Sequence, residues 1–443
     1  MGIVTKLGNY RKKFSSKVEN RELLIDSITA FFIRILAAIA SFLMNMVVAR
    51  KLGAYNSGSF FLCFAVITVI AVVVRLGGDN LLLRYVGIYA PEKKWNSLKL
   101  IVKVIGTRAF ICSVIVAGLL VACNGLIAEY IFHKQDIAGT LFWMMLSMPL
   151  LALYTLMSYA FQGLKKVLFS VSIQNIMVPA LLVVFILIVK PANSVEVAKL
   201  YFASSALTVL FTLFFWYKVT PRHAHQNEEA RLPDGLWRSS YYLWVFAIFQ
   251  IASQWGGQFI AGIYCQQKDL AQLAVAQRIS WLITFILIAV NLVSAPKFAN
   301  LYKQGKMENL KKYALLSTKL MVAFASPIVL FMIIFPKFLL GFFGAGFTTG
   351  APMLIVLALG QFINVLTGSV TLLLMMSGHE RDMRNIQFSV GIFCVVLTFI
   401  LVKTNGVFGA ALATAICVAT QNLICVGVVK KRLGFSTLNI WSR

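Results

Sequence analysis

The sequence is poor in charged residues, and acidic residues are the scarcest of them. Aspartate, glutamate, lysine and arginine make up 13% of the 443 residues, with 15 acidic against 41 basic residues. A soluble domain usually carries about twice this charged fraction. The low charge therefore excludes an ordinary soluble domain, and the 60% of hydrophobic residues indicates a polytopic membrane protein.

Motifs of several common site chemistries are also absent. No GxxxxGK[ST] sequence occurs, which excludes a phosphate-binding loop ATPase. The seven cysteines show no CxxC spacing and are predicted to act as small hydrophobic residues rather than as a disulfide framework. His223 and His225 have no neighbouring Cys or further His, which is typical of a solvated loop and not of a metal site. We therefore predict no metal, no cofactor and no enzymatic activity.

Long apolar segments follow one another along nearly the whole chain. A membrane span needs about 20 apolar residues, and by that measure the chain holds about twelve helices. Their predicted limits are 27–48, 58–88, 104–123, 139–161, 167–189, 195–217, 239–263, 271–295, 310–335, 351–377, 384–402 and 406–429.

Basic residues are distributed unequally between alternate loops. One set of loops and helix ends holds few of them: Arg50, Lys51, Lys134, Lys190, Lys199, Lys268, Lys337 and Lys403. The other set, which includes both termini, holds most of the rest. Because cytoplasmic loops carry the excess of Lys and Arg, we expect both termini in the cytoplasm. The net charge of +26 then sets the orientation and does not indicate a nucleic-acid partner.

Two stretches six predicted helices apart resemble each other. GLKKVLFSVSIQNIMVPALLVVFILIVK, from Gly163, is similar to GHERDMRNIQFSVGIFCVVLTFILVK, from Gly378. Such a repeat predicts an all-α membrane protein of two pseudo-symmetric six-helix bundles that form a V around a central cavity. The bundles would comprise residues 1–219 and 239–430, joined by a cytoplasmic linker, 220–238, and followed by a basic tail, 431–443. The alternative is that apolar helices resemble one another by composition alone.

Five basic side chains fall inside predicted spans, where a charge that faces lipid costs at least about 2.5–3.5 kcal/mol. They are Arg34, Arg75, Arg84, Arg278 and Lys319. Since they come from both halves, we predict that they line a hydrated cationic cavity.

Each of these side chains also has a structural alternative. Arg34 and Lys319 lie near the cytoplasmic end of their helices and could extend to the membrane surface. Arg84 could lie in a cytoplasmic extension of its helix. Arg75 could pair with Asp79 one helical turn away. Asp79 is the only carboxylate well inside a span, which makes it the candidate for coupling to H⁺ or Na⁺.

Uncharged polar residues form a second pattern. Gln250, Gln254 and Gln258 are spaced four apart, and Asn291 lies in the next predicted helix. Such residues often form hydrogen bonds between membrane helices. The alternative is a polar cavity wall that binds sugar hydroxyls, and for the glutamines both interpretations stay open.

The whole chain resembles the polysaccharide transporter family, the flippases for undecaprenyl-linked O-antigen and related oligosaccharides. The resemblance rests on VVARKLGAYNSG after the first helix, YAFQGLKKVLFSVSIQN, AQRISWLITFILIAVNLVSAPKFANLY, PKFLLGFFGAGFTTGAPMLIVLALG and GVFGAALATAICVATQNLI. This family belongs with the multidrug and toxin extrusion transporters and the lipid II flippase. In the lipid II branch, arginines of helices 1, 2 and 8 contribute to a cationic cavity, and Arg34, Arg84 (or Arg75) and Arg278 stand in those helices here. That branch has extra helices, so twelve predicted helices favour the O-antigen branch.

The resemblance implies a flippase of the bacterial inner membrane. It would move an undecaprenyl-diphosphate-linked oligosaccharide from the inner to the outer leaflet by alternating access. Its implied partners are this lipid-linked glycan, membrane lipids, and the polymerase and chain-length proteins of the same glycan pathway. The alternatives are a lipid II flippase and a multidrug or metabolite exporter. Organic cations prefer acidic or aromatic cavities. Five basic residues against one aspartate in the predicted spans therefore disfavour a multidrug exporter.

Overall fold

A computed structural model describes residues 2–220, 230–233 and 235–438. His223 and His225 lie outside these residues, as do parts of the predicted linker and basic tail. The described residues form helices and no strand. Within them, nine helical stretches are long and apolar enough to cross a membrane.

Two of these stretches turn back on themselves at a glycine. Helix α1 (Gly2–Val74) turns at Gly53, with φ 68° and ψ 177°, and α16 (Glu380–Leu433) turns at Gly406, with φ 57° and ψ −138°. Positive φ values favour glycine because it has no Cβ to clash with the backbone. Each of the two stretches therefore supplies two antiparallel helices.

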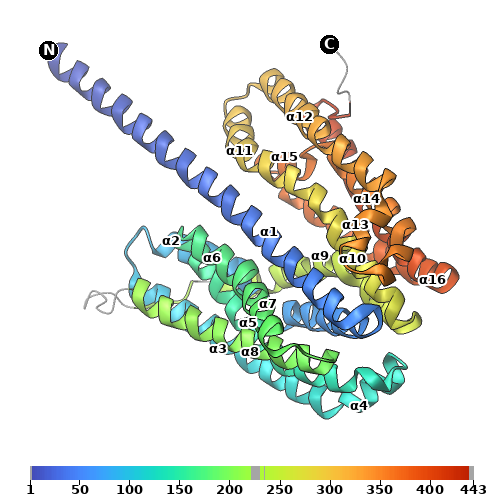
Figure 1. Ribbon diagram of the computed structural model, residues 1–443. Coiled ribbons are helices and arrows are strands. Elements are labelled where there is room, and N and C mark those ends of the chain that lie inside the picture. The colour runs from blue at the N-terminus through green and yellow to red at the C-terminus, as the bar shows by residue number, and fades with distance from the viewer. Residues whose placement is uncertain (1, 221–229, 234, 439–443) are drawn as a thin grey trace.

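All the helices, including both arms of α1 and of α16, fall into two bundles (Figure 1). The first bundle contains α1 and α2 (Gly78–Tyr89), α3 (Trp95–Ala122), α4 (Asn124–Leu126), η1 (Ile127–Ile131), η2 (Gln135–Ile137), α5 (Ala138–Gly163), α6 (Val167–Val171), η3 (Ser172–Met177), α7 (Val178–Val189) and α8 (Ser194–Val219). The second contains α9 (Leu236–Tyr264), α10 (Gln267–Ser280), η4 (Trp281–Ile283), α11 (Thr284–Lys303), α12 (Met307–Ile334), α13 (Pro336–Gly341), η5 (Ala345–Gly350), α14 (Ala351–Thr367), α15 (Val370–Met376) and α16. We call them the N-bundle and the C-bundle.

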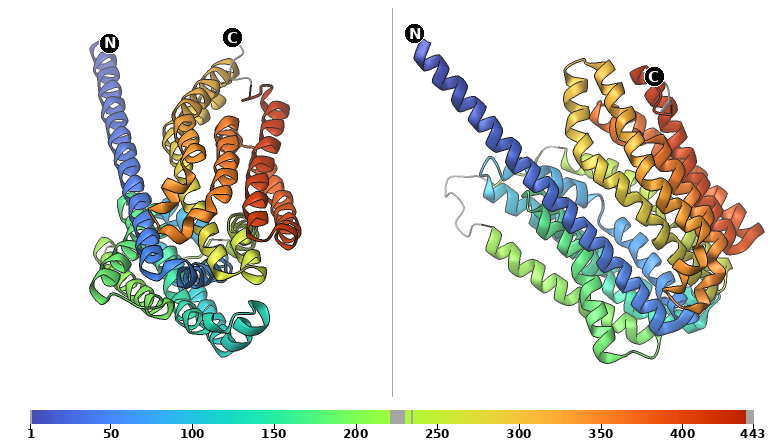
Figure 2. Two further views of the ribbon diagram at one scale, coloured as in Figure 1. Left: turned by 45° about the vertical axis from the view of Figure 1, so that its right-hand side comes forward. Right: turned by 45° about the horizontal axis from the view of Figure 1, so that its top comes forward.

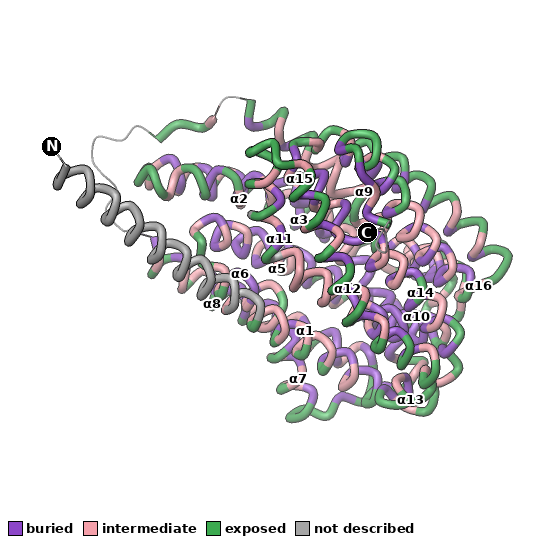
Figure 3. Tube along the Cα trace, turned by 90° about the horizontal axis from the view of Figure 1, so that it is seen from above, coloured by how far each residue is buried: buried purple, intermediate pink, exposed green. Residues whose placement is uncertain are grey.

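Several helices begin well before their predicted limits. Helix α1 begins at Gly2, α3 at Trp95 and α12 at Met307, because hydropathy marks only the apolar part of a helix that continues into polar sequence. The outward faces of the bundles are apolar: Ile188 is 71% exposed, and Leu210 and Phe324 are each 64% exposed. Buried residues concentrate inside the molecule and exposed ones on its outer faces (Figure 3). This arrangement suits a lipid environment.

The two bundles touch near Gly53 and diverge toward the end that holds Gly2 (Figures 1 and 2). We call these ends the Gly53 end and the Gly2 end. At the Gly53 end, α1 packs closely on α10. A Cβ atom at Gly58 would lie 1.8 Å from the carbonyl oxygen of Gln267, so this approach of two backbones requires glycine.

Side chains reinforce the contact at the Gly53 end. Gln267 of the C-bundle accepts a hydrogen bond from Ser59 at 2.9 Å and donates one to the Asp136 carboxylate at 2.9 Å. Tyr55 also donates to Asp136, at 2.7 Å. Lys134 donates to the carbonyl oxygen of Gly262. The bundles are thus joined at this end by one neutral hydrogen bond, between Ser59 and Gln267, and by two that involve a charged group, Asp136 or Lys134.

A second junction lies at the break between α1 and α2. Leu76 and Gly77 have φ values of 51° and 73°, which interrupts the helix and leaves carbonyl groups without helical partners. The C-bundle supplies the donors: Trp244 binds the carbonyl of Val73 at 2.8 Å and Ser240 that of Leu76 at 2.6 Å. The break is therefore stabilised across the two bundles.

The cysteine prediction is wrong for one pair. Cys394 and Cys417, on the two arms of α16, form a disulfide, whereas five other cysteines among the described residues are free. The turn at Gly406 brings the two arms together, which spacing along the sequence did not indicate.

We predict that Gly58→Val opens the Gly53 end, because the added atoms cannot fit against Gln267. Spin labels at Glu129→Cys and Lys268→Cys, both exposed at this end, should then report longer distances by electron–electron double resonance. The matched control is Gly118→Val, since a Cβ at Gly118 meets no atom within 4 Å. Identical distance distributions in both variants would contradict the expectation.

Candidate functional site

Arg278 lies between the two bundles, in the last turn of α10. The helix is interrupted just after it by the 3₁₀ turn η4 and then continues as α11. Its Nε donates a hydrogen bond to the Oδ1 atom of Asn45 in α1, at 3.2 Å. Asn45 is itself fixed, because its amide donates to the carbonyl of Ser41 at 2.6 Å.

Three aromatic rings surround the same guanidinium. Its central carbon lies 5.0 Å from the ring centroid of Trp255, 5.1 Å from Trp281 and 5.8 Å from Phe64. Phe64 belongs to the N-bundle and the tryptophans to the C-bundle. A cation–π contact of this kind is worth about 0.5–2 kcal/mol.

No carboxylate among the described residues pairs with Arg278. Taking a charge out of water costs several kcal/mol, which the rings and one neutral amide offset only in part. The guanidinium also keeps N–H groups that could bind further acceptors. This arrangement favours an anion beside Arg278.

Two cavities adjoin at this point. The smaller, of about 180 Å³, is lined by Arg278 and by Ser41, Met44, Phe64, Tyr154, Gln174, Asn175, Val178, Pro179, Tyr201 and Trp255. The larger, of about 690 Å³, lies mainly in the C-bundle. Asn175 lines both cavities, and we call the two together the central cavity.

The wall of the larger cavity is polar but uncharged. Eight of its residues carry amides and four carry hydroxyls, with two aromatic and two aliphatic residues between them. The amides are Asn175, Gln250, Gln254, Gln361, Asn364, Gln387, Gln421 and Asn422, and the hydroxyls are Ser253, Thr284, Thr371 and Thr414. An amide offers both donors and acceptors, which matches the hydroxyl groups of a sugar.

Some of these amides satisfy one another, whereas others are available to a ligand. Gln421 donates to Gln387 at 3.2 Å, and Asn364 donates to Gln361 at 3.3 Å. In the described part of the chain, the side chains of Gln250, Gln254 and Asn175 make no hydrogen bond.

Local backbone irregularity positions the N-bundle side of the site. Gln174 and Asn175 lie in η3, a π-helical turn between α6 and α7. Such turns insert an extra residue and are frequent at functional sites. Pro179 follows in the first turn of α7, where a proline needs no N–H partner.

The predicted polar residues divide into two groups. Gln250 and Gln254 line the cavity, but Gln258 is 1% exposed, and its Oε1 has no partner among the described residues. Asn291 accepts a hydrogen bond from Ser369 and so links α11 to the segment before α15. Asn291 therefore acts as a contact between helices.

The predicted basic residues are also separated. Arg75 binds Asp79 through its Nε, at 2.8 and 2.9 Å from the two carboxylate oxygens, and the side chains are 8% and 14% exposed. This is the predicted pair four residues apart, but Arg75 lies in the break before α2 and Asp79 in the first turn of α2, and the pair compensates both charges internally.

The other three basic residues do not meet Arg278. Arg84 is exposed and lies over the ring of Tyr85, with its guanidinium carbon 5.5 Å from the centroid. Lys319 is exposed on α12, and Arg34 is half-buried on α1. Neither lines the central cavity. Of the five basic residues predicted to form a cationic cavity, the structure brings only Arg278 to it.

Sequence reasoning did not select several lining residues. Asn175, Gln387, Gln421 and Asn422 stand singly or in pairs within apolar helices, and only helix rotation decides whether they face a cavity. Their common signal is an amide within a predicted span, which Gln361 and Asn364 share.

Comparisons with known proteins agree with this architecture. The MatE family profile matches residues 246–402. Comparison with curated protein sequences finds no significant match. Among solved structures, an inward-facing multidrug resistance transporter of the MATE family has a TM-score of 0.69 and 14% identity, over 95% of this chain and 99% of its own.

Two further solved structures widen the comparison. The lipid II flippase MurJ, in an inward closed conformation, has a TM-score of 0.69 and 13% identity, over 92% of this chain and 87% of its own. A transporter of the MOP superfamily from Pyrococcus furiosus is described as having a binding pocket of reverse polarity. It has a TM-score of 0.64 and 14% identity, over 93% of this chain and 95% of its own. These likenesses confirm the predicted fold class, twelve helices in two bundles of a multi-pass membrane protein.

We predict that Asp79→Asn destabilises the protein by about 3–5 kcal/mol, because it leaves the buried charge of Arg75 without a partner. The double variant Arg75→Gln/Asp79→Asn should regain most of this loss. Thermal unfolding in detergent, followed by size-exclusion chromatography, measures the difference. As a control, Asp382→Asn removes a partner of Arg432 from an exposed pair and should shift the unfolding midpoint little. A double variant no more stable than Asp79→Asn would contradict the pairing argument.

Proposed function

We propose that this protein is a flippase for a lipid diphosphate that carries an oligosaccharide, such as an undecaprenyl-diphosphate-linked O-antigen unit. The observation that carries the proposal is the composition of the central cavity: one arginine without an acidic partner beside a wall of amides and hydroxyls. The arginine suits a phosphate group and the amides suit sugar hydroxyls. The bundles diverge toward the Gly2 end, which the loop charges predict to be cytoplasmic.

In this proposal the diphosphate binds Arg278 and the glycan occupies the amide-lined cavity of the C-bundle. Trp281 lines that cavity and also faces Arg278, so it lies where the first sugar would meet the phosphate. The lipid tail stays in the membrane between the bundles. Opening of the Gly53 end and closure of the Gly2 end would then release the glycan at the outer leaflet of the bacterial inner membrane. The protein does no bond chemistry in this cycle.

Two other substrates of proteins with this fold are less well supported. A cationic drug would meet Arg278 and no carboxylate in the wall of the central cavity. A lipid II molecule carries the same diphosphate, and the structural similarity to MurJ favours it as the second candidate. Comparing the rates at which the protein transports lipid II and a polyprenyl diphosphate that carries an oligosaccharide distinguishes these two candidates.

Arg278→Gln should slow flipping about 10- to 150-fold, because a hydrogen bond to a charged group is worth about 1.5–3 kcal/mol. Proteoliposomes with a fluorescent polyprenyl-diphosphate oligosaccharide measure the rate. Arg278→Lys should retain part of it, since the ammonium keeps the charge but loses the planar donor set. Arg34→Gln is the comparison, and equal losses at Arg34 and Arg278 would favour the wider ring of cations over a single arginine.

Gln250→Leu and Gln254→Leu should reduce flipping of glycan-bearing lipid while leaving the rate for a polyprenyl diphosphate without sugar unchanged. The chain offers a matched control, Gln258→Leu, on the same helix but outside the cavity. We expect Gln258→Leu to be nearly neutral, because the side-chain oxygen it removes has no partner among the described residues. Equal effects of all three substitutions on both lipids would oppose a glycan-binding wall.

We further propose that return of the empty transporter is coupled to H⁺ or Na⁺ through Asp79. Its pairing with Arg75 means that proton or sodium binding would have to compete with an ion pair. If coupling occurs there, the double variant Arg75→Gln/Asp79→Asn should flip substrate at a rate independent of an imposed H⁺ or Na⁺ gradient. A gradient dependence equal to that of the native protein would exclude this role.

A further inference from the structure

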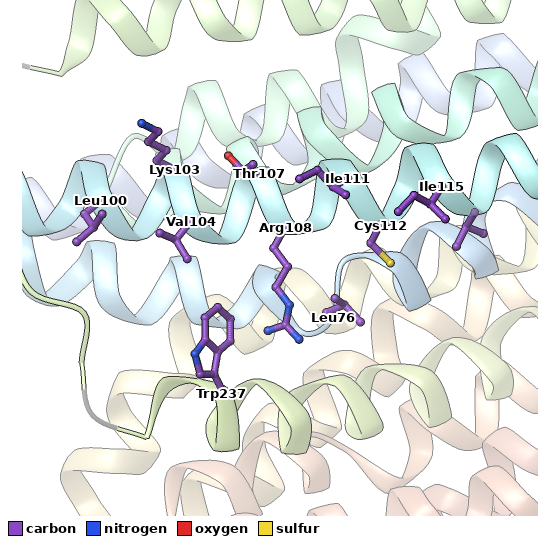
Figure 4. Close-up of a pocket in the computed structure, with 11 residues that line it drawn as sticks. Leu76, Leu100, Lys103, Val104, Thr107, Arg108, Ile111, Cys112, Ile115 and Trp237 are labelled. Carbon is purple, nitrogen blue, oxygen red and sulfur yellow. The ribbon is translucent and has the colours of Figure 1, made fainter.

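A groove of about 780 Å³ runs along the outer face of α3, away from the central cavity (Figure 4). Leu100, Val104, Ile111 and Ile115 recur at helical spacing along its floor, and Trp237 of the C-bundle closes one side. None of its lining residues also lines the central cavity. The groove has the size of a small-molecule site but an almost wholly apolar lining.

One cation is held at the edge of this groove. The guanidinium carbon of Arg108 lies 4.3 Å from a ring centroid of Trp237, and Figure 4 shows the side chain extended from α3 toward that ring. Arg108 forms neither a hydrogen bond nor an ion pair with any residue that the structure describes. Its contact with the indole fixes its position and leaves its N–H groups available to an acceptor.

A second cation lies on the opposite rim. Lys103 is more than one turn nearer the start of α3, and its side chain points away from Trp237 (Figure 4). No acidic side chain lines the groove. The groove therefore combines an apolar floor with two positive charges, Lys103 and Arg108, and the stretch of floor from Ile111 to Val116 carries no charge.

The spacing along α3 matches one membrane leaflet. From Arg108 to Val116 the helix rises about 12 Å, at about 1.5 Å per residue. Half of a hydrocarbon core is about 15 Å thick. The loop charges predict that α3 begins in the cytoplasm, so Arg108 would lie near the phosphate level of the inner leaflet and Val116 near the bilayer centre.

We propose that this groove binds one anionic phospholipid of the inner leaflet. Its phosphate would accept hydrogen bonds from Arg108, and its acyl chain would lie along Ile111 and Ile115, which are 52% and 57% exposed. The occupant is a resident lipid and not the transported one. The bonds of Ser240 and Trp244 to the break between α1 and α2 join the two bundles beside Leu76, which lines the groove.

The groove is formed by residues of both bundles, so its shape depends on how the bundles are positioned against each other. Arg108 belongs to the N-bundle and Trp237 is the second residue of α9 in the C-bundle. A lipid that touches both stabilises the arrangement in which they meet and shifts the population toward it.

The test uses the full-length protein in phosphatidylcholine vesicles with and without dibrominated phosphatidylglycerol. Bromine quenches nearby tryptophan, and the difference in quenching between the native protein and Trp237→Phe isolates Trp237 among the eight tryptophans. We expect preferential quenching of Trp237 by the anionic lipid. Arg108→Gln should weaken that binding about tenfold, as expected for loss of a charged hydrogen-bond donor. Lys103→Gln should weaken it less.

Lys218→Gln is the matched control. It removes a cation that also lies over a ring, 4.4 Å from the centroid of Phe214, but that does not line the groove. If Arg108→Gln does not fold, Ile115→Phe narrows the groove while keeping both cations and the same eight tryptophans, and it should also weaken the preference. Equal quenching by brominated phosphatidylcholine, an unchanged affinity in both groove variants, or tighter binding of a polyprenyl phosphate at Trp237 would overturn the proposal.

Discussion

The central constraint on this structure is a guanidinium held between two bundles with no carboxylate to neutralise it. Arg278 is fixed by one neutral amide and three aromatic rings, drawn from both bundles. These groups orient the guanidinium but do not neutralise its charge. A dry interface would make such a charge very costly, so the cavities beside it are a physical requirement of the fold. The interruption after α10 and the π-helical turn η3 both shape that space.

Arg75 shows how the same residue type is used differently. Like Arg278 it lies beside an interruption of a helix, but its Nε is paired with the carboxylate of Asp79, four residues further along the N-bundle. Its charge is therefore already compensated. The two arginines are equally unusual in an apolar sequence, and only their partners distinguish a structural charge from one that can bind a ligand. The function of a buried arginine therefore depends on which side chains contact it, and the sequence composition does not show this.

The spans and the two-bundle architecture follow from hydropathy and charge asymmetry, which are local properties that survive any rotation of a helix. The residues that line the cavity cannot be predicted in this way, because they depend on how each helix is rotated about its axis. Gln258 lies eight residues beyond Gln250, about 80° further around the helix, so a stripe that starts in the cavity ends in the core. Gln387 and Gln421 meet only because the two arms of α16 pack together, and Asn175 joins the same cavity from η3 of the other bundle. The Cys394–Cys417 bond likewise follows from the turn at Gly406, which has no signal in cysteine spacing.

The two junctions between the bundles differ in what would be lost on opening them. At the Gly53 end, the bond between Ser59 and Gln267 is neutral and worth about 0.5–1.5 kcal/mol, whereas those of Asp136 and Lys134 involve charged groups and are worth about 1.5–3 kcal/mol each. At the break between α1 and α2, Trp244 donates to the carbonyl of Val73, which also accepts a bond of 3.3 Å from the N–H of Leu76, and Ser240 donates to the carbonyl of Leu76. Each of these two bonds from the C-bundle is neutral and worth about 0.5–1.5 kcal/mol. Since the bundles already diverge toward the Gly2 end, the bonds at the Gly53 end are the ones that must break in the proposed transport cycle.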